Sequence, residues 1–383
     1  PCNYYPKESP PLFYAASTAG TPFRFNTHVS DLGHTLIFGP PGSGKSTLLA
    51  LMAAQARRYN NSKVFVFDKG RSMLPLTYAI PDAVHYDIGK DEKLGFCPFS
   101  KVKTDSDKLW MEEWIITILK LQKIDASPRQ KKEIRSAIFN HVDSGDISFH
   151  DFVTNLQDRE MSSALNSYII TDIKNYALLD FLEDGLQESN FNTFEVDELM
   201  NMSQAQALPV ILYLFWQIEK QLDGSPAYIF LDEVWILLGD ETFREKIREW
   251  LKVLRKSNCA VIMSTQSISD ATNSGILDVI NESCPTKIYL PNPSAQDESS
   301  TLLYKQLGLN IREIQLLAEA RQKHDYYYRS PEGRRWFQLD LGHYALSFVG
   351  ASGKEDIKRV EDLHEIHGND WTHFWLRERG VIQ

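Results

Sequence analysis

The chain has 383 residues, of which 43% are hydrophobic and 24% charged, and its formal net charge is −10 at pH 7. This composition predicts a folded, globular chain of two domains, or of one domain with a large insertion. The net negative charge argues against an extended nucleic-acid-binding surface, because phosphate binding requires clustered Lys and Arg. A net negative charge is still compatible with a local basic channel.

The four cysteines lack the C-x-x-C spacing that is typical of zinc sites, and no disulfide framework is indicated. They are Cys2, Cys97, Cys259 and Cys284. Free cysteines favour a reducing compartment, so we expect a cytoplasmic protein. The longest apolar run, residues 208–216, is too short to cross a bilayer and predicts a buried helix. The start at Pro1, with no signal-peptide pattern, leads us to expect a fragment of a longer protein.

A glycine-rich motif, GPPGSGKST, lies between a predicted strand at residues 34–38 and a predicted helix at residues 48–54. It comprises Gly39, Pro40, Pro41, Gly42, Ser43, Gly44, Lys45, Ser46 and Thr47. In this setting, backbone N–H groups and the helix N-terminus converge on one anion. The pattern predicts a P-loop in which Lys45 reaches the β- and γ-phosphates of ATP and Ser46 ligates Mg²⁺. The alternative is a glycine-rich turn between two core elements.

Two further strands are predicted at residues 63–68 and 83–87. Strands that alternate with helices after a P-loop predict an α/β fold with a mainly parallel sheet and helices on both faces. Asp68 ends its strand at the edge where ligands bind in open α/β sheets. A residue that only caps the end of the strand is an equally good interpretation.

Residues 104–222 change character, with few β-branched runs and repeated helical spacing. We predict that they form a helical insertion subdomain, and that residues 1–103 and 223–383 form the P-loop domain. The Trp and Phe side chains of the insertion recur at three- and four-residue intervals, which predicts a packed core. Its Lys/Arg-rich segment, residues 128–135, is interpreted as a solvated helix face, with a binding patch as the alternative.

The sheet resumes at residues 227–233, where apolar residues are followed by Asp232 and Glu233. This is a Walker B pattern, in which a buried strand delivers its terminal carboxylates to the nucleotide. Asp232 is predicted to hold Mg²⁺, directly or through water, and Glu233 to polarise the attacking water as general base. The strand at residues 259–266 ends in Gln266, which can bond the γ-phosphate or that water. Together with the P-loop, these residues predict an ATP-hydrolysing motor protein.

The C-terminal third contains several further predicted elements. They are a helix at residues 243–256 with one apolar face, a strand at 286–290, a helix at 311–320, a hairpin around 330–333, a strand at 344–349 and a helix from about 355. The aromatic hairpin strands either cover the adenine base or form the edge of the sheet.

The P-loop, the helical insertion, YIFLDE, the helix WLKVLRKSN, and STQS followed by Asp270 together resemble the C-terminal ATPase domain of the VirB4 family of type IV secretion ATPases. This family includes the conjugation proteins called TrbE and TraC. The resemblance spans nearly the whole chain, and the RKxN element before the TQS strand is its most specific part. It implies a RecA-like P-loop ATPase related to the HerA and FtsK translocases, and a hexamer or other oligomer with nucleotide between subunits.

The resemblance also implies other type IV secretion components as partners and a position peripheral to the bacterial inner membrane, reached through those partners or through a missing N-terminal domain. In related translocases, a basic residue on the helix before the TQS strand reaches the nucleotide of the neighbouring subunit. Arg255 matches this role, with Lys256 beside it. The alternative is a pair of cations placed favourably at a helix C-terminus.

We therefore expect the ATP-hydrolysing motor domain of a type IV secretion or conjugation system, which energises assembly of the channel or pilus and substrate transfer. A HerA/FtsK-like DNA translocase or coupling protein is the first alternative, and direct DNA binding stays open because the chain is acidic. A nucleotide-gated scaffold with little turnover is the second alternative. Glu233 and Gln266 count against it, since both are suited to hydrolysis.

Overall fold

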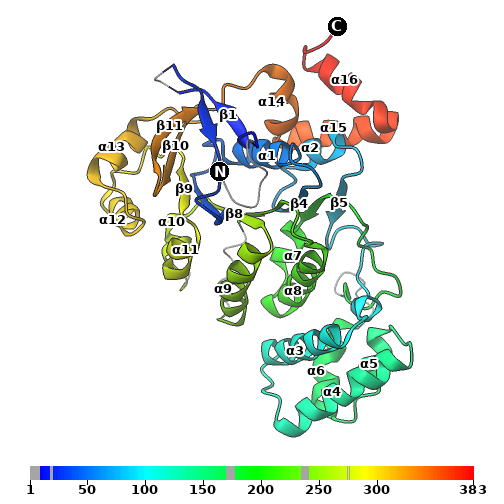
Figure 1. Cartoon of the computed structure of the whole chain (residues 1–383). Helices are drawn as coiled ribbons and strands as arrows, with labels where there is room; N and C mark the ends of the chain where they lie inside the picture. The colour runs from blue at the N-terminus through cyan, green and yellow to red at the C-terminus, as the bar shows by residue number, and fades with distance from the viewer. Residues whose placement is uncertain (1–8, 18–19, 170–176, 234–240, 274, 276) are drawn as a thin grey trace. The chain divides into compact units, whose positions relative to one another are not determined.

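The computed structural model describes residues 9–17, 20–169, 177–233, 241–273, 275 and 277–383 (Figure 1). Cys2, counted above among the cysteines, lies outside these residues. The chain divides into two compact units, which are described separately. The first comprises Pro1–His85, Ser189–Glu195 and Leu222–Gln383, and the second comprises Tyr86–Glu188 and Val196–Gln221.

Most described strands belong to one nine-stranded sheet, in the order β11-β10-β9-β3-β8-β7-β4-β6-β5. Its members are β3 (Thr35–Phe38), β4 (Lys63–Asp68), β5 (Val84–Asp87), β6 (Phe191–Glu195), β7 (Ala227–Asp232), β8 (Cys259–Thr265), β9 (Thr286–Tyr289), β10 (Asp325–Ser330) and β11 (Gly333–Gln338). A separate two-stranded sheet pairs β1 (Phe13–Ala15) with β2 (Phe23–Phe25).

The centre of the large sheet is parallel. Strands β9, β3, β8, β7, β4 and β6 pair in parallel, so their carboxyl ends meet at one edge. β10 pairs antiparallel with both β9 and β11. The predicted mainly parallel sheet with a C-terminal antiparallel hairpin is therefore confirmed.

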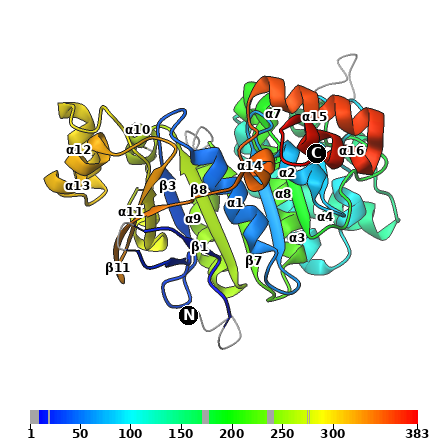
Figure 2. The same ribbon diagram turned by 90° about the horizontal axis from the view of Figure 1, so that it is seen from above.

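Helices of the first unit cover both faces of its sheet. They are α1 (Lys45–Ala56), α2 (Leu74–Ala79), α9 (Glu241–Lys256), α10 (Ile268–Asn273), α11 (Leu277–Ser283), α12 (Glu298–Gln306), α13 (Ile311–Glu319), α14 (His343–Val349), α15 (Lys354–His367) and α16 (Trp371–Glu378). Helices α1, α2, α14 and α15 lie on one face, and α9, α10 and α11 on the other (Figures 1 and 2). A core cluster packs α1 against the sheet, with Leu48 and Met52 beside Val64 and Val66.

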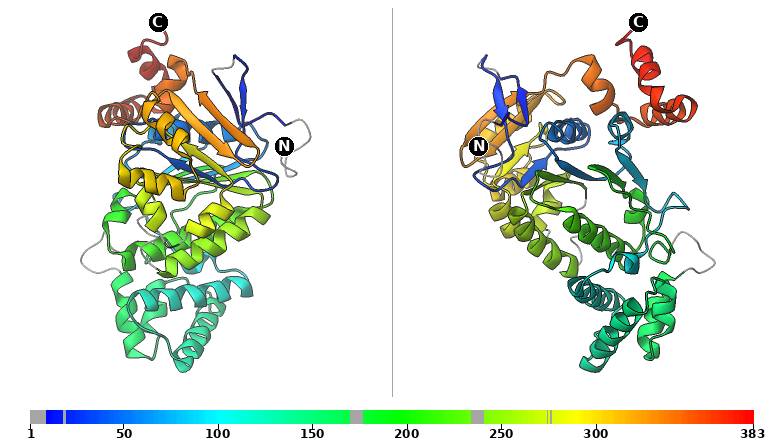
Figure 3. Two further views of the ribbon diagram at one scale, coloured as in Figure 1. Left: turned by 90° about the vertical axis from the view of Figure 1, so that its left-hand side faces the viewer. Right: turned by 45° about the vertical axis from the view of Figure 1, so that its right-hand side comes forward.

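The second unit is built from helices. They are α3 (Asp105–Leu121), α4 (Pro128–Asp143), α5 (Phe149–Thr154), α6 (Arg159–Leu165), α7 (Asp197–Asn201) and α8 (Gln204–Gln221), shown from two further sides in Figure 3. The rings of Trp110 and Trp216 stack with centroids 4.0 Å apart, and Trp114 Nε1 donates to the Pro209 carbonyl at 3.1 Å. The predicted aromatic core is confirmed. Residues 128–135 are mostly exposed, and Arg135 pairs with Glu112 at 2.7 Å. Exposure fits both a solvated face and a binding patch, so the solvated face stays a prediction.

Two predictions of local structure are wrong. Residues 104–222 were expected to hold helices alone, but β6 is a strand that pairs with β4. Its polar Asn192, Thr193 and Glu195 are buried by the neighbouring strands, so no hydrophobic pattern marks it. Residues 344–349 were expected to form a strand, yet they lie in α14. Burial in this segment is confined to its last three residues, 347–349, and a run of six residues does not distinguish helix from strand by itself.

Within the described part of the chain, no helix combines the length and the apolar character that spanning a membrane requires.

Candidate nucleotide-binding site

The P-loop connects the end of β3 to the start of α1. Gly39 N–H donates to the Thr265 carbonyl at 3.2 Å, which anchors the start of the loop to β8. Gly42 and Gly44 have φ angles of +73° and +104°, a region that glycine adopts without steric cost. A Cβ atom on Gly44 would lie 2.7 Å from the hydroxyl of Tyr326. The motif therefore folds as the tight strand-loop-helix turn that was predicted.

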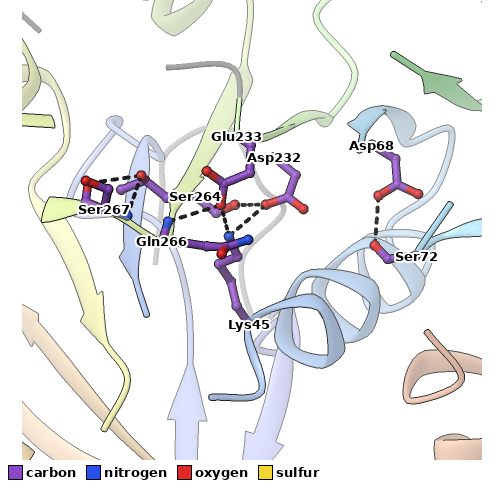
Figure 4. A network of polar contacts seen from close by, with 9 residues as sticks. Lys45, Asp68, Ser72, Asp232, Glu233, Ser264, Gln266 and Ser267 are labelled. Carbon is purple, nitrogen blue, oxygen red and sulfur yellow. Dashed lines mark hydrogen bonds and ion pairs between the residues drawn. The ribbon is translucent and has the colours of Figure 1, made fainter. Parts of the chain in front are cut away.

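Lys45 meets both Walker B acids at the carboxyl edge of the sheet (Figure 4). Its side chain is 6% exposed, and Nζ lies 3.3 Å from Asp232 Oδ1 and forms an ion pair with Glu233 Oε1. Ser264, the partner of Asp232 in the β7–β8 register, donates its hydroxyl to Asp232 Oδ1. The structure thus brings together three predicted catalytic and metal-binding residues and adds Ser264, the first residue of the STQS motif, to which no role was assigned from the sequence.

Glu233 lies just after β7 in an uncommon backbone conformation. Its φ is +57°, the left-handed region, which non-glycine residues enter at a cost and which is found often at functional sites. Glu233 Oε1 accepts the backbone N–H of Gln266 at 3.0 Å, and the Glu233 N–H donates to the Ser264 carbonyl at 3.3 Å. The Gln266 side chain is exposed. The ends of β7 and β8 therefore fix the carboxylate of Glu233 beside Lys45.

A pocket of about 590 Å³ opens over the P-loop. One wall is formed by Pro40, Pro41, Gly42, Gly44, Lys45, Ser46, Thr47 and Gln266, and the other by Lys323, His324, Tyr326, Leu339, Asp340, Leu341, Leu346, Gly350 and Ser352. The second wall also supports the loop, since Lys323 N–H donates to the Ser43 carbonyl at 2.9 Å and the Tyr326 hydroxyl donates to the Gly44 carbonyl at 3.3 Å. In this wall Lys323, Asp340 and Ser352 carried no sequence signal.

Asp68 ends β4 as predicted, but it does not line this pocket. Its buried carboxylate accepts the Ser72 hydroxyl and the Met73 N–H, both at 2.7 Å. Burial, followed by the charge of Glu195, raises the pKa of Asp68 to about 8. Glu195 is its register partner on β6 and accepts the Gly70 N–H at 3.0 Å. Asp68 therefore fits the role of a residue that caps the end of its strand better than that of a nucleotide ligand.

Arg255 lies at the C-terminal end of α9, shortly before β8 begins. This is the amino edge of the parallel strands, opposite the P-loop. Its Nη2 pairs with Asp31 at 2.9 Å, and its side chain is 48% exposed, as expected for a cation at the surface. Lys256 is exposed beside it. Within one chain the structure does not bring Arg255 to the site, so a role toward a neighbouring subunit stays a prediction.

Comparison with known proteins places this chain in a family. Conjugal transfer protein TrbE of Rhizobium radiobacter is 52% identical over 388 residues, covering 100% of this chain and 47% of that protein. A probable conjugal transfer protein TrbE of Sinorhizobium fredii is 50% identical over 385 residues, covering 99% and 58%. Type IV secretion system protein virB4 of Bartonella quintana is 26% identical over 354 residues, covering 91% and 44%. This chain belongs to the TrbE/VirB4 family. No family model matches it.

The TrbE/VirB4 chain spans about half the length of the curated relatives it matches. Among solved structures, VirB4 of Thermoanaerobacter pseudethanolicus superposes with a TM-score of 0.68 at 16% identity, covering 89% of this chain and 99% of that one. Plasmid coupling protein TrwB in complex with ADP and Mg²⁺ gives a TM-score of 0.53 at 13% identity, covering 81% and 86%. At such identities the likeness concerns the fold alone, and it confirms a P-loop α/β fold like that of VirB4 and TrwB.

Proposed function

We propose that this TrbE/VirB4 chain binds ATP with Mg²⁺ and hydrolyses it, as a motor domain of a type IV secretion or conjugation system. We base the chemistry on one cluster, in which Lys45 of the P-loop pairs with both Asp232 and Glu233 at the carboxyl edge of the sheet. The family supports the biological task, which is to energise assembly of the channel or pilus and transfer of substrate.

The residues present fit ATP and Mg²⁺. The pocket of about 590 Å³ has the size of a small-molecule site, and its floor is the glycine turn. Ser43 Oγ is buried there and lacks a hydrogen-bond partner among the described residues. The amides of residues 44–47, at the N-terminus of α1, and the Lys45 ammonium group would hold the phosphates, and Ser46 and Asp232 would hold the metal. Bound Mg²⁺ supplies positive charge to the phosphate oxygens. A related fold, that of TrwB, has been solved with ADP and Mg²⁺.

The ion pairs of Lys45 indicate how the chain's own residues respond to nucleotide. Phosphates over the P-loop compete with Asp232 and Glu233 for Lys45, because all three are anions near one ammonium group. When Lys45 turns to the phosphates, Glu233 loses a cation and becomes a better base. The Gln266 N–H, 3.0 Å from Glu233 Oε1, keeps that carboxylate in place. Glu233 would then take the proton of the attacking water.

The opposite wall of the pocket suits the rest of the nucleotide. Leu339, Leu341 and Leu346 contribute apolar side chains to this wall. Lys323 and His324 come just before β10, and the Lys323 N–H contacts the P-loop at the Ser43 carbonyl. A purine base needs apolar contact on its faces and few polar partners. We therefore place the base against these leucines.

The substitution Glu233→Gln tests this assignment. Loss of a general base lowers turnover by roughly a hundredfold or more, while ATP affinity is kept or rises because Lys45 loses a competing carboxylate. Turnover is measured by phosphate release, and affinity by fluorescence of a labelled ATP analogue. Glu249→Gln, an exposed carboxylate on α9, makes the same change in charge away from the pocket and should behave as wild type. Wild-type turnover by Glu233→Gln would refute the role of base.

A DNA translocase or coupling protein remains the second candidate, since the TrwB fold is shared. Added DNA should raise the turnover of a DNA motor severalfold, with salt-sensitive binding. For a VirB4-like motor, turnover should not depend on DNA. We further propose, from the family, that the chain acts as a hexamer or other oligomer in the cytoplasm at the inner membrane, with type IV secretion components as partners. Turnover measured against protein concentration tests the oligomer.

A further inference from the structure

A second large pocket lies in the first unit, away from the P-loop. Its volume is about 660 Å³. The charged side chains of its lining are Glu282, Lys287, Arg329 and Arg334, and Gly308 also lines it. We call it the basic pocket. Lys287 is the second residue of β9, a strand parallel to β3, so the basic pocket lies at the amino edge of the sheet. The P-loop lies at the carboxyl edge.

Two cations face one another in this pocket. Lys287 and Arg329 are register partners in the antiparallel pair of β9 and β10, so their side chains lie on the same face. Like charges directly opposite each other destabilise a sheet unless an anion lies between them. Neither side chain forms an ion pair with any residue that the structure describes. Burial, together with the charge of Arg329, lowers the pKa of Lys287.

Neutral groups fix the position of Arg329. Its Nη1 donates to the Leu307 carbonyl at 3.1 Å, and its guanidinium contacts the backbone of Gly308. Gly308 has a φ of +87°, and a Cβ there would lie 2.9 Å from Nη1. The guanidinium is thus oriented in advance, while no acidic side chain of the described residues pairs with it. This is the arrangement expected of a binding residue and not of a surface ion pair.

Acidic groups do little to neutralise the basic pocket. Arg334 pairs with Glu313 at 3.0 Å, and Glu313 also accepts the Tyr327 hydroxyl at 2.6 Å. Glu282 is the one acid among the lining residues, and it is exposed. A site with three cations and one acid is unusual on a chain of net charge −10. Such a concave positive site concentrates anions from solution.

We propose that the basic pocket binds a phosphate group, carried either by a nucleic-acid strand or by a small free phosphate compound. Phosphate oxygens in a tetrahedral arrangement can meet the planar guanidinium of Arg329 and the ammonium group of Lys287 at once. The pocket is far larger than one phosphate, so it has room for the sugar or base that carries it. This site is independent of the P-loop, and its occupancy does not require ATP hydrolysis.

Lys287→Gln and Arg329→Gln test the proposal, with Arg335→Gln as the matched control. Arg335 lies on the same hairpin, is exposed, and is absent from the pocket lining. The first probe is a fluorescein-labelled oligothymidine, read by anisotropy at several salt concentrations. The second is inorganic phosphate, read by the rise in Tm. The P-loop is unchanged in all variants, so a difference from wild type reports the basic pocket.

If nucleic acid is the source, each pocket variant loses about tenfold in oligonucleotide affinity, and the slope of log K against log salt becomes shallower by about 0.7. If free phosphate is the source, phosphate raises the Tm of wild type more than that of the pocket variants, and oligonucleotide affinity does not differ among them. In both cases Arg335→Gln behaves as wild type, and Arg329→Lys, which keeps the charge, recovers part of the binding.

Equal behaviour of wild type and the pocket variants toward both probes would overturn the proposal, as would an equal loss in Arg335→Gln. A polyglutamate peptide that binds wild type but not the pocket variants, when neither phosphate probe does so, would also overturn it and point to an acidic protein partner. Lys287→Gln relieves a repulsion, so it should unfold no more easily than wild type. That variant keeps the test valid if Arg329→Gln, which loses the bond to Leu307, is unstable.

Discussion

The positive charge of Lys45 is balanced by the carboxylates of Asp232 and Glu233. These three charges are buried or nearly buried, and each is stabilised by a partner of opposite charge. Asp232 and Lys45 are both buried, and Glu233 is 15% exposed. Removal of one partner from such a cluster costs more than the ion pair itself contributes, because the remaining charge is left without compensation. The cluster to which we assign phosphate binding therefore also holds the C-terminal end of β7 and the N-terminal end of α1 together.

Lys45→Ala should abolish ATP binding or turnover, because the point charge over the β- and γ-phosphates is lost. It should also lower the unfolding free energy of the nucleotide-free protein by about 3 to 5 kcal/mol, since Asp232 and Glu233 are then left without a cation and repel each other. Urea unfolding and binding of a fluorescent ATP analogue measure the two effects. Adding Glu233→Gln to this variant should restore part of the stability, as expected for coupled neighbours. Wild-type hydrolysis by Lys45→Ala would exclude the P-loop assignment.

Asp68 gives the nucleotide-free protein a pH dependence. Its folded-state pKa of about 8 lies above the ordinary value of 3.8, so the folded state holds one more proton between these two values. Stability from this group is therefore complete at low pH and falls as pH rises toward about 8, by at most about 1.4 kcal/mol per pH unit. Asp68→Asn should flatten this decline. Urea unfolding from pH 5 to 9, without nucleotide or Mg²⁺, measures it, and parallel curves for the two proteins would contradict it.

At the level of elements, the C-terminal part of the chain supports the glycine-rich turn of the P-loop. Strand β10 and the residues before it contact the loop through Tyr326 and Lys323, which donate to the carbonyls of Gly44 and Ser43. These elements follow the P-loop by almost 280 residues, yet they form the second wall of its pocket. Displacement of the hairpin should therefore alter nucleotide affinity.

Gly44→Ala tests this support. The new Cβ would lie 2.7 Å from the Tyr326 hydroxyl and 3.2 Å from Lys323 Cα, and the residue would stay at a φ of +104°. We expect a loss of about 1 to 3 kcal/mol in stability and a strong loss of nucleotide affinity. Gly42→Ala is the matched control, because its φ is +73° but no atom lies within 4 Å of the new Cβ. If the two variants lose the same amount in thermal unfolding and ATP binding, contact with the hairpin has no role.

At the scale of the whole molecule, the role of Arg255 has two interpretations. As a residue acting in trans, it reaches the nucleotide of a neighbour across an oligomer. As a structural cation, it joins the end of α9 to the loop before β3 through Asp31. Both interpretations fit its exposed position at the amino edge of the sheet, so only assembly distinguishes them.

Arg255→Ala should lower turnover in the oligomer by roughly a thousandfold if it acts in trans, with ATP affinity of the isolated chain unchanged. Asp31→Asn is the control, because it breaks the same ion pair and leaves the arginine in place. Mixtures of Arg255→Ala with Glu233→Gln chains should then recover part of the hydrolysis, since each supplies the half that the other lacks. Equal effects of Asp31→Asn and Arg255→Ala, or no recovery in mixtures shown to co-assemble, would favour the structural interpretation.

The sequence by itself determined the P-loop, the Walker B strand, the strand that ends at Gln266 and the hairpin. These elements have local signals, such as glycines where φ is positive, apolar runs that end in acids, and a turn between aromatic strands. Short-range physics is enough to form them, so a pattern of neighbouring residues indicates them.

Only the tertiary structure decided the rest. Strand β6 and the second wall of the pocket depend on burial by residues far away in the sequence, and polar residues such as Asn192 carry no sign of it. The position of Arg255 opposite the P-loop follows from the length and direction of α9, and the pairing of Lys287 with Arg329 follows from the register of β9 and β10. Strand order and register decide which charged side chains lie next to one another. The periodicity of residues along the chain does not specify strand order or register between distant strands.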